Sequence, residues 1–420
     1  MSRSPSWLRI GWRNLGRNPR RTVVTAGGLA VGYFAVVGLI GWVDGLTAEM
    51  VENSTGLMTG QIKIQASDYQ PDESLYDTIG GRDGIDVSDV LQTITADPAV
   101  VGVAPRVYAG GLISSGEATS AGMIMGIDPD YELSVTRFLR ELADGRLPRP
   151  DVNEVAIGAE LARQLAVHLG DEVVLVSQGA DGSMGNDLYE VVGTVSMGLP
   201  ELDAAVIVLS IQTLQELIVL DPGRIHEVLV TTVDPFVASD VALRLASGPV
   251  ATAADVDVMG WTEFQPSIME YVALVGSFYG MIFAVVFGMA AFGVANTMLM
   301  ATFERRREFA VMLALGTAPR HIVLSVLAES LAMGFVSLVV GAGFTIPIVL
   351  WLHNYPLDLS WLYSGITFEG TLISPTIRME YDISVWLQSA LALLVTSILA
   401  ALYPAARASR IAPADTLSEL

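Results

Sequence analysis

Residues 23–43 read VVTAGGLAVGYFAVVGLIGWV, and no charged side chain interrupts them. A helix needs about 20 mostly apolar residues to cross roughly 30 Å of hydrocarbon. Three later stretches have the same apolar character, at 271–303, 321–352 and 383–403. The sequence therefore predicts an integral membrane protein with four transmembrane helices, one before a long polar segment and three after it, a 1+3 layout.

The charges of the chain are divided between separate segments. The net charge of the 420 residues is −22, yet residues 1–21 hold six arginines and no acidic residue. Residues 48–268 hold 34 acidic residues against 10 basic ones. An acidic bulk argues against nucleic-acid binding, which needs a basic face. The chain has no cysteine, so disulfides and thiolate metal sites are excluded.

The arginine-rich segments predict the orientation. They precede the first span, join the second to the third, and follow the fourth. The positive-inside bias makes these segments cytoplasmic, with both termini inside and the acidic segment outside. The predicted parts are a cytoplasmic amphipathic helix at 1–22, a first span at 23–45, an outer domain at 46–268, a second span with its stalk at 269–303, a cytoplasmic coupling helix at 304–320, a third span at 321–352, an outer loop at 353–382, a fourth span at 383–403 and a cytoplasmic tail at 404–420.

Two terminal features of the spans carry further expectations. The second apolar stretch is longer than a bilayer requires, so Glu263–Glu270 either form a helical stalk outside the membrane or belong to a tilted span. At the N-terminus, Trp7, Leu8, Trp12 and Leu15 fall near one helical face with arginines elsewhere. This spacing predicts a basic amphipathic helix in the membrane interface, the alternative being a disordered basic anchor.

The outer segment predicts an α+β domain of two lobes, with an inserted lobe at about 134–219. Short runs that alternate polar and apolar residues are broken by turn residues, which is typical of strands. The expected strands are 61–65, 100–108, 122–127, 172–178, 189–196, 227–233 and 256–261, and the expected helices are 87–96, 160–168 and 235–246.

Catalytic chemistry is not apparent in this segment. Asp128, Asp130 and Glu132 alternate like calcium ligands, but the glycine and closing glutamate of an EF-hand loop are absent. His168 and His226 stand alone, so neither predicts a metal site or a nucleophile–base pair. The chain also lacks the G-x-x-x-x-G-K-[ST] phosphate-binding loop. We therefore expect no catalytic residue, no metal, no bound cofactor and no ATP hydrolysis by this chain alone.

The link between the second and third spans predicts a docking helix. Residues 304–316 read ERRREFAVMLALG, a charge cluster followed by an apolar run too short to span a membrane. An apolar face of Phe309, Met312 and Leu313 exposed to the cytoplasm would be a costly patch, so we expect it to dock into a groove of another protein. The alternative is a topogenic charge cluster at the frayed end of a span.

Four motifs together resemble a known family. They are NTM at 296–298 leading into the 304–316 segment and Glu329, YPAARASRIAP at 403–413, WRNL at 12–15, and TGQIKI at 59–64 with Tyr69. In this order and span layout the chain resembles the FtsX/MacB superfamily of transporter permeases, and most of all the LolC/LolE-type lipoprotein-releasing permeases. One departure is Ala310, where family members often carry glycine.

The resemblance implies a permease subunit in the bacterial inner membrane, working with partners. Two such subunits, identical or different, would sit on two copies of a separate ABC ATPase that supplies ATP and Mg. A periplasmic carrier or effector protein is a further possible partner. The ATPase would grip the coupling helix through residues of the 304–316 segment, namely Glu304, Arg306, Glu308, Phe309, Met312, Leu313, Leu315 and Gly316.

The expected substrate is a lipoprotein or another amphiphile taken from the outer leaflet of the inner membrane. Its candidate surface joins the first and second spans near their outer ends, through Val36, Leu39, Ile40, Val43, Phe278, Ile282 and Val286. These residues are equally well explained as ordinary lipid-facing side chains. Two other functions stay open: an FtsX-like regulator that transmits force to a periplasmic hydrolase or sensor, and a MacB-like exporter of peptides or drugs.

Overall fold

The protein is described by a computed structural model whose chain divides into two compact units. The residues described are 19–71, 73–81, 86–140, 142–248, 255–362, 366–368, 371–373 and 376–412. A helical unit comprises Met1–Ala48, Tyr271–Ser364 and Pro375–Leu420, and an α+β unit comprises Glu49–Glu270 and Gly365–Ser374. The predicted amphipathic helix at 1–22 lies almost entirely outside the described residues, which begin at Pro19.

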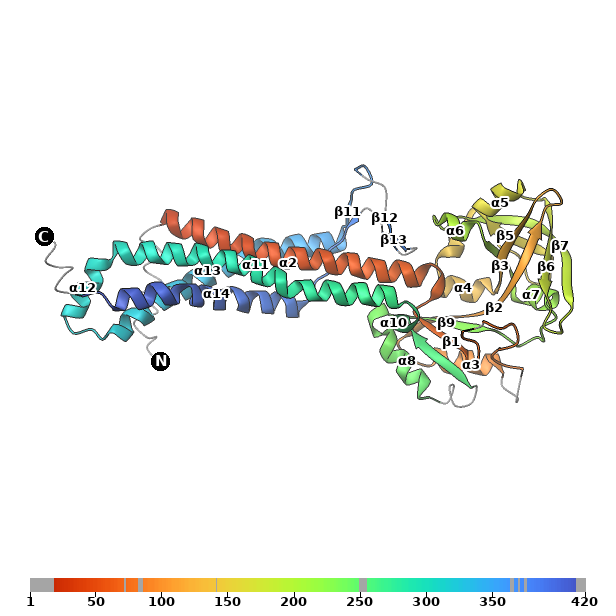
Figure 1. Ribbon diagram of the computed structural model, residues 1–420, viewed down its shortest axis with the longest axis horizontal. Helices are drawn as coiled ribbons and strands as arrows, with labels where there is room; N and C mark the ends of the chain where they lie inside the picture. The colour runs from red at the N-terminus through yellow and green to blue at the C-terminus, as the bar shows by residue number, and fades with distance from the viewer. Residues whose placement is uncertain are drawn as a thin grey trace. The chain divides into compact units, whose positions relative to one another are not determined.

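Four long helices confirm the predicted spans (Figure 1). They are α2 (Pro19–Ser54), α11 (Pro266–Glu304), α13 (Pro319–Asn354) and α14 (Ile383–Ser409). Each is long and apolar enough to cross a membrane. Helix α2 runs on past the predicted end at 45 and continues as a π-helical segment, η1 (Thr55–Thr59).

The predicted stalk is interrupted near its start. A short helix, α10 (Trp261–Phe264), ends at Gln265, whose φ of −126° and ψ of 62° are not helical, and α11 begins at Pro266. A residue that precedes proline is pushed out of the helical region, whereas proline itself suits the first helical turn. The stalk expected at Glu263–Glu270 is therefore two helical pieces rather than one continuous helix.

Small residues let the helices of this unit approach closely. A Cβ atom added to Gly334 of α13 would lie 2.7 Å from the Ser397 hydroxyl of α14, and one added to Gly341 would lie 3.1 Å from the Ala30 carbonyl oxygen of α2. Between α13 and α14, the Ser330 hydroxyl donates to the Ser397 carbonyl oxygen at 2.6 Å. Close backbone contact and such interhelical bonds stabilise helix pairs in membranes.

The outer part of α2 holds an extended segment against its glycines. The Glu380 backbone N–H donates to the Gly41 carbonyl oxygen at 2.9 Å, and a Cβ atom on Gly41 would lie 2.7 Å from the Glu380 carbonyl oxygen. A Cβ atom on Gly45 would come closer still to the Arg378 carbonyl oxygen. Two glycines one helical turn apart thus allow the backbone of residues 378–380 to pack directly against α2.

The α+β unit contains one ten-stranded mixed sheet, in the order β10-β1-β9-β2-β3-β8-β5-β7-β4, with β6 bonded to β2 and β7. The strands are β1 (Ile62–Ala66), β2 (Val100–Ser114), β3 (Thr119–Ile127), β4 (Leu142–Gly145), β5 (Glu154–Gly158), β6 (Glu172–Gln178), β7 (Met184–Val195), β8 (Val206–Ser210), β9 (Glu227–Thr232) and β10 (Val256–Gly260). Strands from both ends of the segment, β1, β9 and β10, pair together at one end of the sheet.

The long strand β2 joins the two parts of the sheet. Its first half pairs with β9, and its second half pairs with β3 and β6. The further pairs β3–β8, β8–β5, β5–β7 and β7–β6 return to β2 and close a six-stranded ring. A closed ring leaves no open sheet edge among these strands. The ring includes β2 and β3, which precede the expected start of the insertion at 134.

Helices cover the sheet and connect its strands. They are α3 (Val87–Thr95), α4 (Pro129–Val135), η2 (Phe138–Arg140), α5 (Ala159–Leu165), α6 (Pro200–Asp203), α7 (Ile211–Leu217), η3 (Pro235–Val237) and α8 (Ala238–Ala246). Between α13 and α14 lie two small strand pairs, β11 (Leu357–Asp358) with β14 (Thr376–Ile377) and β12 (Ile366–Phe368) with β13 (Thr371–Ile373).

We expect Gly45→Val to lower the melting temperature of the purified full-length chain, because a side chain there collides with the backbone at Arg378. Forcing extra atoms into a packed contact costs about 1–3 kcal/mol. The control is Gly276→Val in α11, where an added Cβ meets nothing within 4 Å. Equal melting temperatures for the two variants would contradict the close packing of residues 378–380 against Gly45.

Candidate functional site

The predicted coupling segment folds as a short helix with a defined end. Helix α12 spans Arg306–Ala314, and Gly316 follows it with φ of 88°. The Thr317 N–H donates to the Met312 carbonyl oxygen and the Gly316 N–H to the Leu313 carbonyl oxygen, each at 3.0 Å. This pair of bonds is a Schellman motif, and its left-handed position favours glycine. Gly316 therefore ends α12 and turns the chain into α13.

Phe309 does not have the exposure expected of a docking residue. Its side chain is 2% exposed and belongs to a core with Ile322 and Val326 of α13 and Ala405 and Ala408 of α14. The prediction that Phe309, Met312 and Leu313 form an exposed face is therefore wrong for Phe309. The fourth spanning helix, α14, returns beside α12 and covers the Phe309 side chain. Leu313 is half-buried against the same core.

Arg305 fixes the start of α12. Its Nη1 lies 2.8 Å from Glu329 Oε2 in α13, and its Nε lies 3.0 Å from Glu308 Oε2. The guanidinium carbon also lies 5.1 Å from the centre of the Phe309 ring. Arg305 was missing from the residues predicted for this site. The signal that could have found it is Glu329, a carboxylate in an apolar span that requires a cationic partner.

Three apolar side chains stay exposed on a different face: two belong to α12, and the third is Leu315, the residue directly after it. Val311 is 44% exposed, Met312 37% and Leu315 82%. Of the other predicted residues, Arg306, Glu308 and Gly316 are exposed. Glu304 forms an ion pair with Arg21, with Oε2 lying 3.0 Å from Nη1. The helix is therefore held by its buried residues and presents Val311, Met312 and Leu315 outward; a coupling role for the predicted set stays a prediction.

The predicted substrate surface divides into buried and exposed residues. Val36 and Ile40 of α2 are buried in the core of the helical unit, and Ile282 and Val286 of α11 pack against the same core. Leu39 is 39% and Phe278 46% exposed. Val43 is half-buried. The structure thus brings four of the seven residues together between α2 and α11, and contact of any of them with a substrate stays a prediction.

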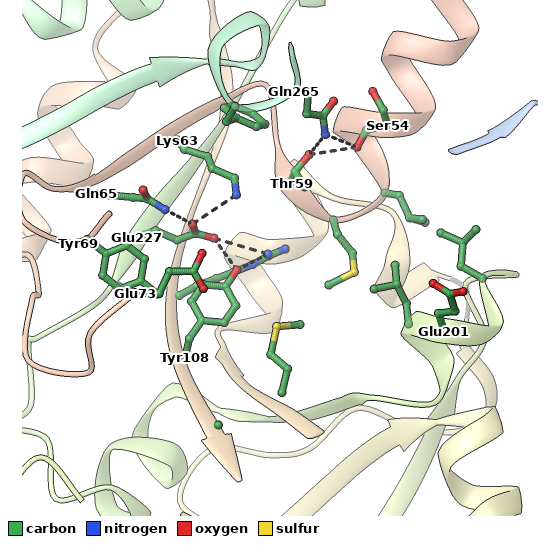
Figure 2. Close-up of a pocket in the computed structure, with 18 of the residues that line it drawn as sticks. Ser54, Thr59, Lys63, Gln65, Tyr69, Glu73, Tyr108, Glu201, Glu227 and Gln265 are labelled. Carbon is green, nitrogen blue, oxygen red and sulfur yellow. Dashed lines mark hydrogen bonds and ion pairs between the residues drawn. The ribbon is translucent and has the colours of Figure 1, made fainter. Parts of the chain in front are cut away.

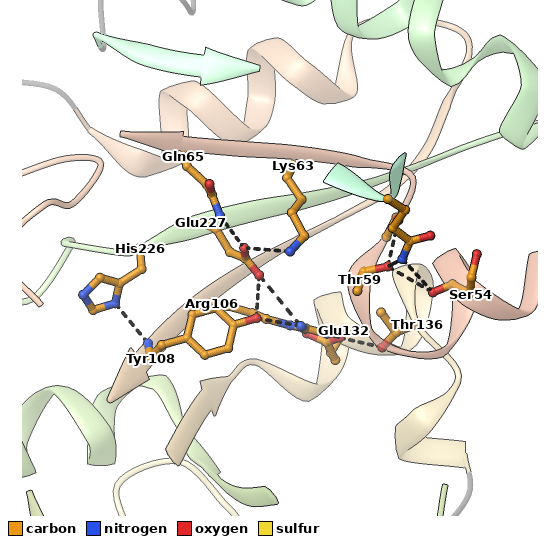
Figure 3. Close-up of polar contacts among 12 residues, drawn as sticks. Ser54, Thr59, Lys63, Gln65, Arg106, Tyr108, Glu132, Thr136, His226 and Glu227 are labelled. Carbon is orange, nitrogen blue, oxygen red and sulfur yellow. Dashed lines mark hydrogen bonds and ion pairs between the residues drawn. The ribbon is translucent and has the colours of Figure 1, made fainter. Parts of the chain in front are cut away.

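A buried ion pair lies inside the α+β unit (Figure 3). Arg106 of β2 donates through Nη2 to Glu132 Oε1 at 2.5 Å and through Nε to Glu132 Oε2 at 3.1 Å. Arg106 is 1% exposed and Glu132 of α4 is fully buried. Burial alone would lower the pKa of Arg106, but the charge and hydrogen bonds of Glu132 together with the charges of Tyr108 and Glu227 outweigh it, and the pKa lies above its ordinary value. This bidentate pair joins β2 to α4.

The polar network continues from Arg106 to β9 and β1. The Tyr108 hydroxyl accepts from Arg106 Nη1 at 2.8 Å and donates to Glu227 Oε1 at 2.5 Å. Glu227 also accepts from Gln65 Nε2 at 3.0 Å, and Lys63 Nζ lies 3.9 Å from it. Burial raises the pKa of Tyr108 well above its ordinary value, so this hydroxyl stays protonated as a donor. These polar contacts join three strands, β1, β2 and β9, and one helix, α4.

The network borders a cavity of about 1310 Å³ (Figure 2). Its walls come from the end of α2, η1, β1, β2, β3, β9, α6, α10 and the start of α11, in parts that all belong to the α+β unit. The apolar part of the wall is Leu57, Met58, Met123, Leu199, Leu202 and Phe264, and the polar part includes Lys63, Gln65, Tyr69, Glu73, Glu201 and Gln265. Sequence reasoning did not find this cavity, because its residues are scattered over the whole outer segment.

His226 takes a structural place beside the cavity wall. Its Nδ1 accepts a hydrogen bond from the Tyr108 backbone N–H at 3.0 Å, and its Nε2 lies 3.2 Å from the Leu75 carbonyl oxygen. These partners require a neutral ring with the proton on Nε2. Burial lowers the pKa of His226. Among the described residues, no group of three or more His, Cys, Asp and Glu side chains could hold a metal ion.

Comparison with known proteins places the chain in a family. A model of the MacB-like periplasmic core domain matches residues 22–254, and a model of the FtsX-like permease C-terminal region matches residues 280–413. The chain belongs to the family of permeases that combine a MacB-like periplasmic core domain with an FtsX-like C-terminal region. The match confirms the resemblance found in the sequence.

Individual relatives are similar over most of their length. The chain is 26% identical to the lipoprotein-releasing system transmembrane protein LolC of Xylella fastidiosa, over 76% of this chain and 78% of the relative. It is 23% identical to LolC of Neisseria meningitidis, over 94% and 93%. A solved structure, the periplasmic region of MacB from Actinobacillus actinomycetemcomitans, aligns with 19% identity and a TM-score of 0.35, covering 52% of this chain and 97% of that one.

Arg106→Met should destabilise the α+β unit strongly, because it leaves Glu132 buried and unpaired. Loss of one partner of a buried pair costs about 3–5 kcal/mol. Chemical denaturation of the full chain, followed by the circular dichroism of its sheet, measures this loss. The matched control is Arg163→Met, which removes a 77% exposed arginine paired with Glu160 and should change little. Similar losses in both variants would contradict the role of the buried pair.

His226 predicts a loss of stability on acidification. Its pKa in the folded chain lies below the unfolded value of about 6.5, so the unfolded chain binds the proton first as the pH falls. The melting temperature should therefore fall as the pH drops below about 6.5, the unfolded-state pKa of histidine.

The slope of this fall distinguishes His226 from the other histidines. His226→Gln should flatten it, whereas His168→Gln, at a side chain that is 88% exposed, should leave it unchanged. An unaltered slope in the His226 variant would refute the assignment.

Proposed function

We propose that this chain is the permease subunit of an ATP-binding cassette transporter of the mechanotransmission type. Separate ATPase subunits grip helix α12 and transmit movement to the outer domain. The observation that carries the proposal is the exposed apolar face of Val311, Met312 and Leu315 on a helix whose other side is anchored by Phe309 and Arg305. An exposed apolar helix face is suited to a groove in a partner protein.

The division of labour between two kinds of subunit is supported by the sequence. The chain has no Walker phosphate-binding loop, so ATP and Mg are supplied through the partner. The arginine clusters support a cytoplasmic position for α12 and both termini, on the side where such an ATPase works, and a periplasmic position for the acidic domain. We infer two ATPase copies and a second permease subunit, identical or different.

A lipoprotein is the substrate that the relatives favour. The LolC proteins of Xylella fastidiosa and Neisseria meningitidis are named as parts of lipoprotein-releasing systems. We infer that this chain takes a lipoprotein, or another amphiphile, from the outer leaflet of the inner membrane. The exposed Leu39 and Phe278, one on each of α2 and α11, are the residues of the predicted surface that a lipid chain could reach without repacking the core.

The match to the MacB-like core domain favours a second candidate, a peptide or drug exporter, and the FtsX-like region a third, a regulator of a periplasmic enzyme or sensor. Stimulation of the ATPase in the reconstituted complex separates them. Lipoprotein should stimulate ATP hydrolysis if the first proposal holds. Stimulation by a soluble periplasmic protein alone, or by a drug alone, would replace it with one of the others.

Replacement of Met312 and Leu315 by aspartate should weaken binding of the ATPase at least thirtyfold, because the loss of even one central apolar anchor costs about 2 kcal/mol. The measurement is co-purification of the two proteins and the ATPase rate of the complex. The control is Leu243→Asp, an equally simple change at a leucine of α8 that is 68% exposed.

The double variant should still insert and remain folded, since neither side chain is part of the core. Full ATPase stimulation by a variant that is inserted normally would contradict docking at this face. Phe309→Asp is not a clean test, because Phe309 holds α12 against α13 and α14.

A further inference from the structure

Three parts of the helical unit meet at the end from which α2 continues into the α+β unit, which we call the domain-side end. The Glu380 N–H donates to the Gly41 carbonyl oxygen of α2 at 2.9 Å. At the end of α13, His353 Nδ1 lies 3.1 Å from the Met379 carbonyl oxygen. The apolar stretch of α2 ends at Val43, beside these contacts. The contacts therefore mark the level at which the helices leave the hydrocarbon of the bilayer.

Exposed aromatic side chains gather at this level. They are Trp42 of α2, which is 37% exposed, Trp351 of α13 at 55%, Tyr355 at 67% and Tyr381 at 44%. Each lies within two residues of Gly41, His353 or Glu380 in the sequence. Tryptophan and tyrosine are enriched where a membrane protein passes from hydrocarbon to water, because their rings are apolar and carry one polar group. These residues therefore indicate the bilayer interface at the domain-side end.

Residues 355–362, which follow α13, form an exposed apolar segment. They read YPLDLSWL, and Asp358 is the one charged residue among them. Trp361 is 79% exposed, Leu362 64% and Leu357 45%. Large apolar side chains that gather on a surface indicate contact with a membrane, a ligand or another protein. The described part of the chain leaves these side chains uncovered, so the segment requires a neighbour from outside the chain.

This segment is held close to the interface. Strand β11, inside the segment, pairs with β14, and β14 leads directly into residues 378–380, which pack against α2. The Ser360 N–H donates to Asp358 Oδ1 at 2.7 Å and turns the chain. Three residues span at most about 11 Å, so Trp361 stays near the paired strands. The exposed apolar side chains therefore lie near the level at which the helices leave the hydrocarbon.

The position and the charge of the segment favour lipid as this neighbour. Its eight residues are continuous with a spanning helix and lie beside the exposed aromatic residues of the same end. A single charge lets the segment enter the headgroup region without taking several charged groups out of water. Trp361 suits this place, because an indole ring combines a large apolar surface with one N–H donor. A soluble partner would have to displace lipid headgroups to cover the same side chains.

We propose that residues 355–362 are a membrane-binding loop, which lies in the bilayer interface at the domain-side end and turns Trp361 and Leu362 toward the acyl chains. Asp358 holds the turn and remains among the headgroups. The loop fixes the depth of α13 in the bilayer, and the β11–β14 pair transmits this constraint to α2 through residues 378–380. This role depends neither on the partner of α12 nor on the substrate.

The test uses the full chain in phosphatidylcholine nanodiscs with one nitroxide label. Because the chain has no cysteine, Leu362→Cys provides a single labelling site. Power-saturation electron paramagnetic resonance compares collisions with oxygen, which is concentrated in lipid, and with a water-soluble nickel chelate. The label at 362 should be accessible to oxygen and several times less accessible to nickel than the matched control, Leu243→Cys. Leu243 lies on α8 of the α+β unit and is 68% exposed, against 64% for Leu362.

A second substitution tests whether Trp361 holds the loop in the membrane. Trp361→Asp in the labelled Leu362→Cys chain should raise the accessibility to nickel several-fold, because a charged side chain is unfavourable in the interface. The control is Tyr131→Asp in the same labelled chain, at a tyrosine of α4 that is 43% exposed. This change should leave the label at 362 as it was.

Three outcomes would overturn the proposal. Nickel accessibility at 362 equal to that at 243 would place the loop in water. Low accessibility to both reagents would place it under protein, such as a second copy of this chain. An unchanged label in the Trp361 variant would remove the anchor. The nanodiscs contain no ATPase and no substrate, so a failure here is distinct from a failure of the proposed transport function.

Discussion

The ion pair between Arg305 and Glu329 is the interaction on which the proposed coupling depends. A carboxylate that is 5% exposed on an apolar helix is costly unless a cation neutralises it. Arg305 does so at 2.8 Å, and its guanidinium also covers the ring of Phe309. One arginine thus fixes the end of α11, the start of α12 and the inner part of α13. Because α12 is fixed on this side, a force applied to its exposed side moves the spanning helices rather than the loop alone.

The α+β unit is also held together by a buried ion pair between an arginine and a glutamate. Arg106 and Glu132 form a buried charge pair, and Tyr108 and Glu227 extend it to a neighbouring strand. Strand β2 carries Arg106 and belongs to both parts of the sheet, so the pair lies where the ring and the β1–β9–β10 end meet. Buried charges of this kind specify one arrangement of the elements around them.

Sequence reasoning succeeded where a pattern is local. Hydropathy located the four spans, and alternation located strands such as β6. It missed β5 and β8, since every residue of these strands is buried and their sequences do not alternate. It also assigned Phe309 to the exposed face of α12, because the return of α14 beside α12 is a tertiary contact. The residues that line the cavity lie far apart in the chain, so no local spacing in the sequence predicts the cavity.

The proposed coupling through α12 is tested most directly by determining on which side of the membrane this helix lies. Because the chain has no cysteine, Leu315→Cys provides a single thiol at a side chain that is 82% exposed. A membrane-impermeant maleimide should leave this thiol unlabelled in intact spheroplasts, label it in inverted membrane vesicles, and label it less when the partner ATPase is bound. Labelling in intact spheroplasts would place α12 on the outer side of the membrane and contradict the proposed transmission of force.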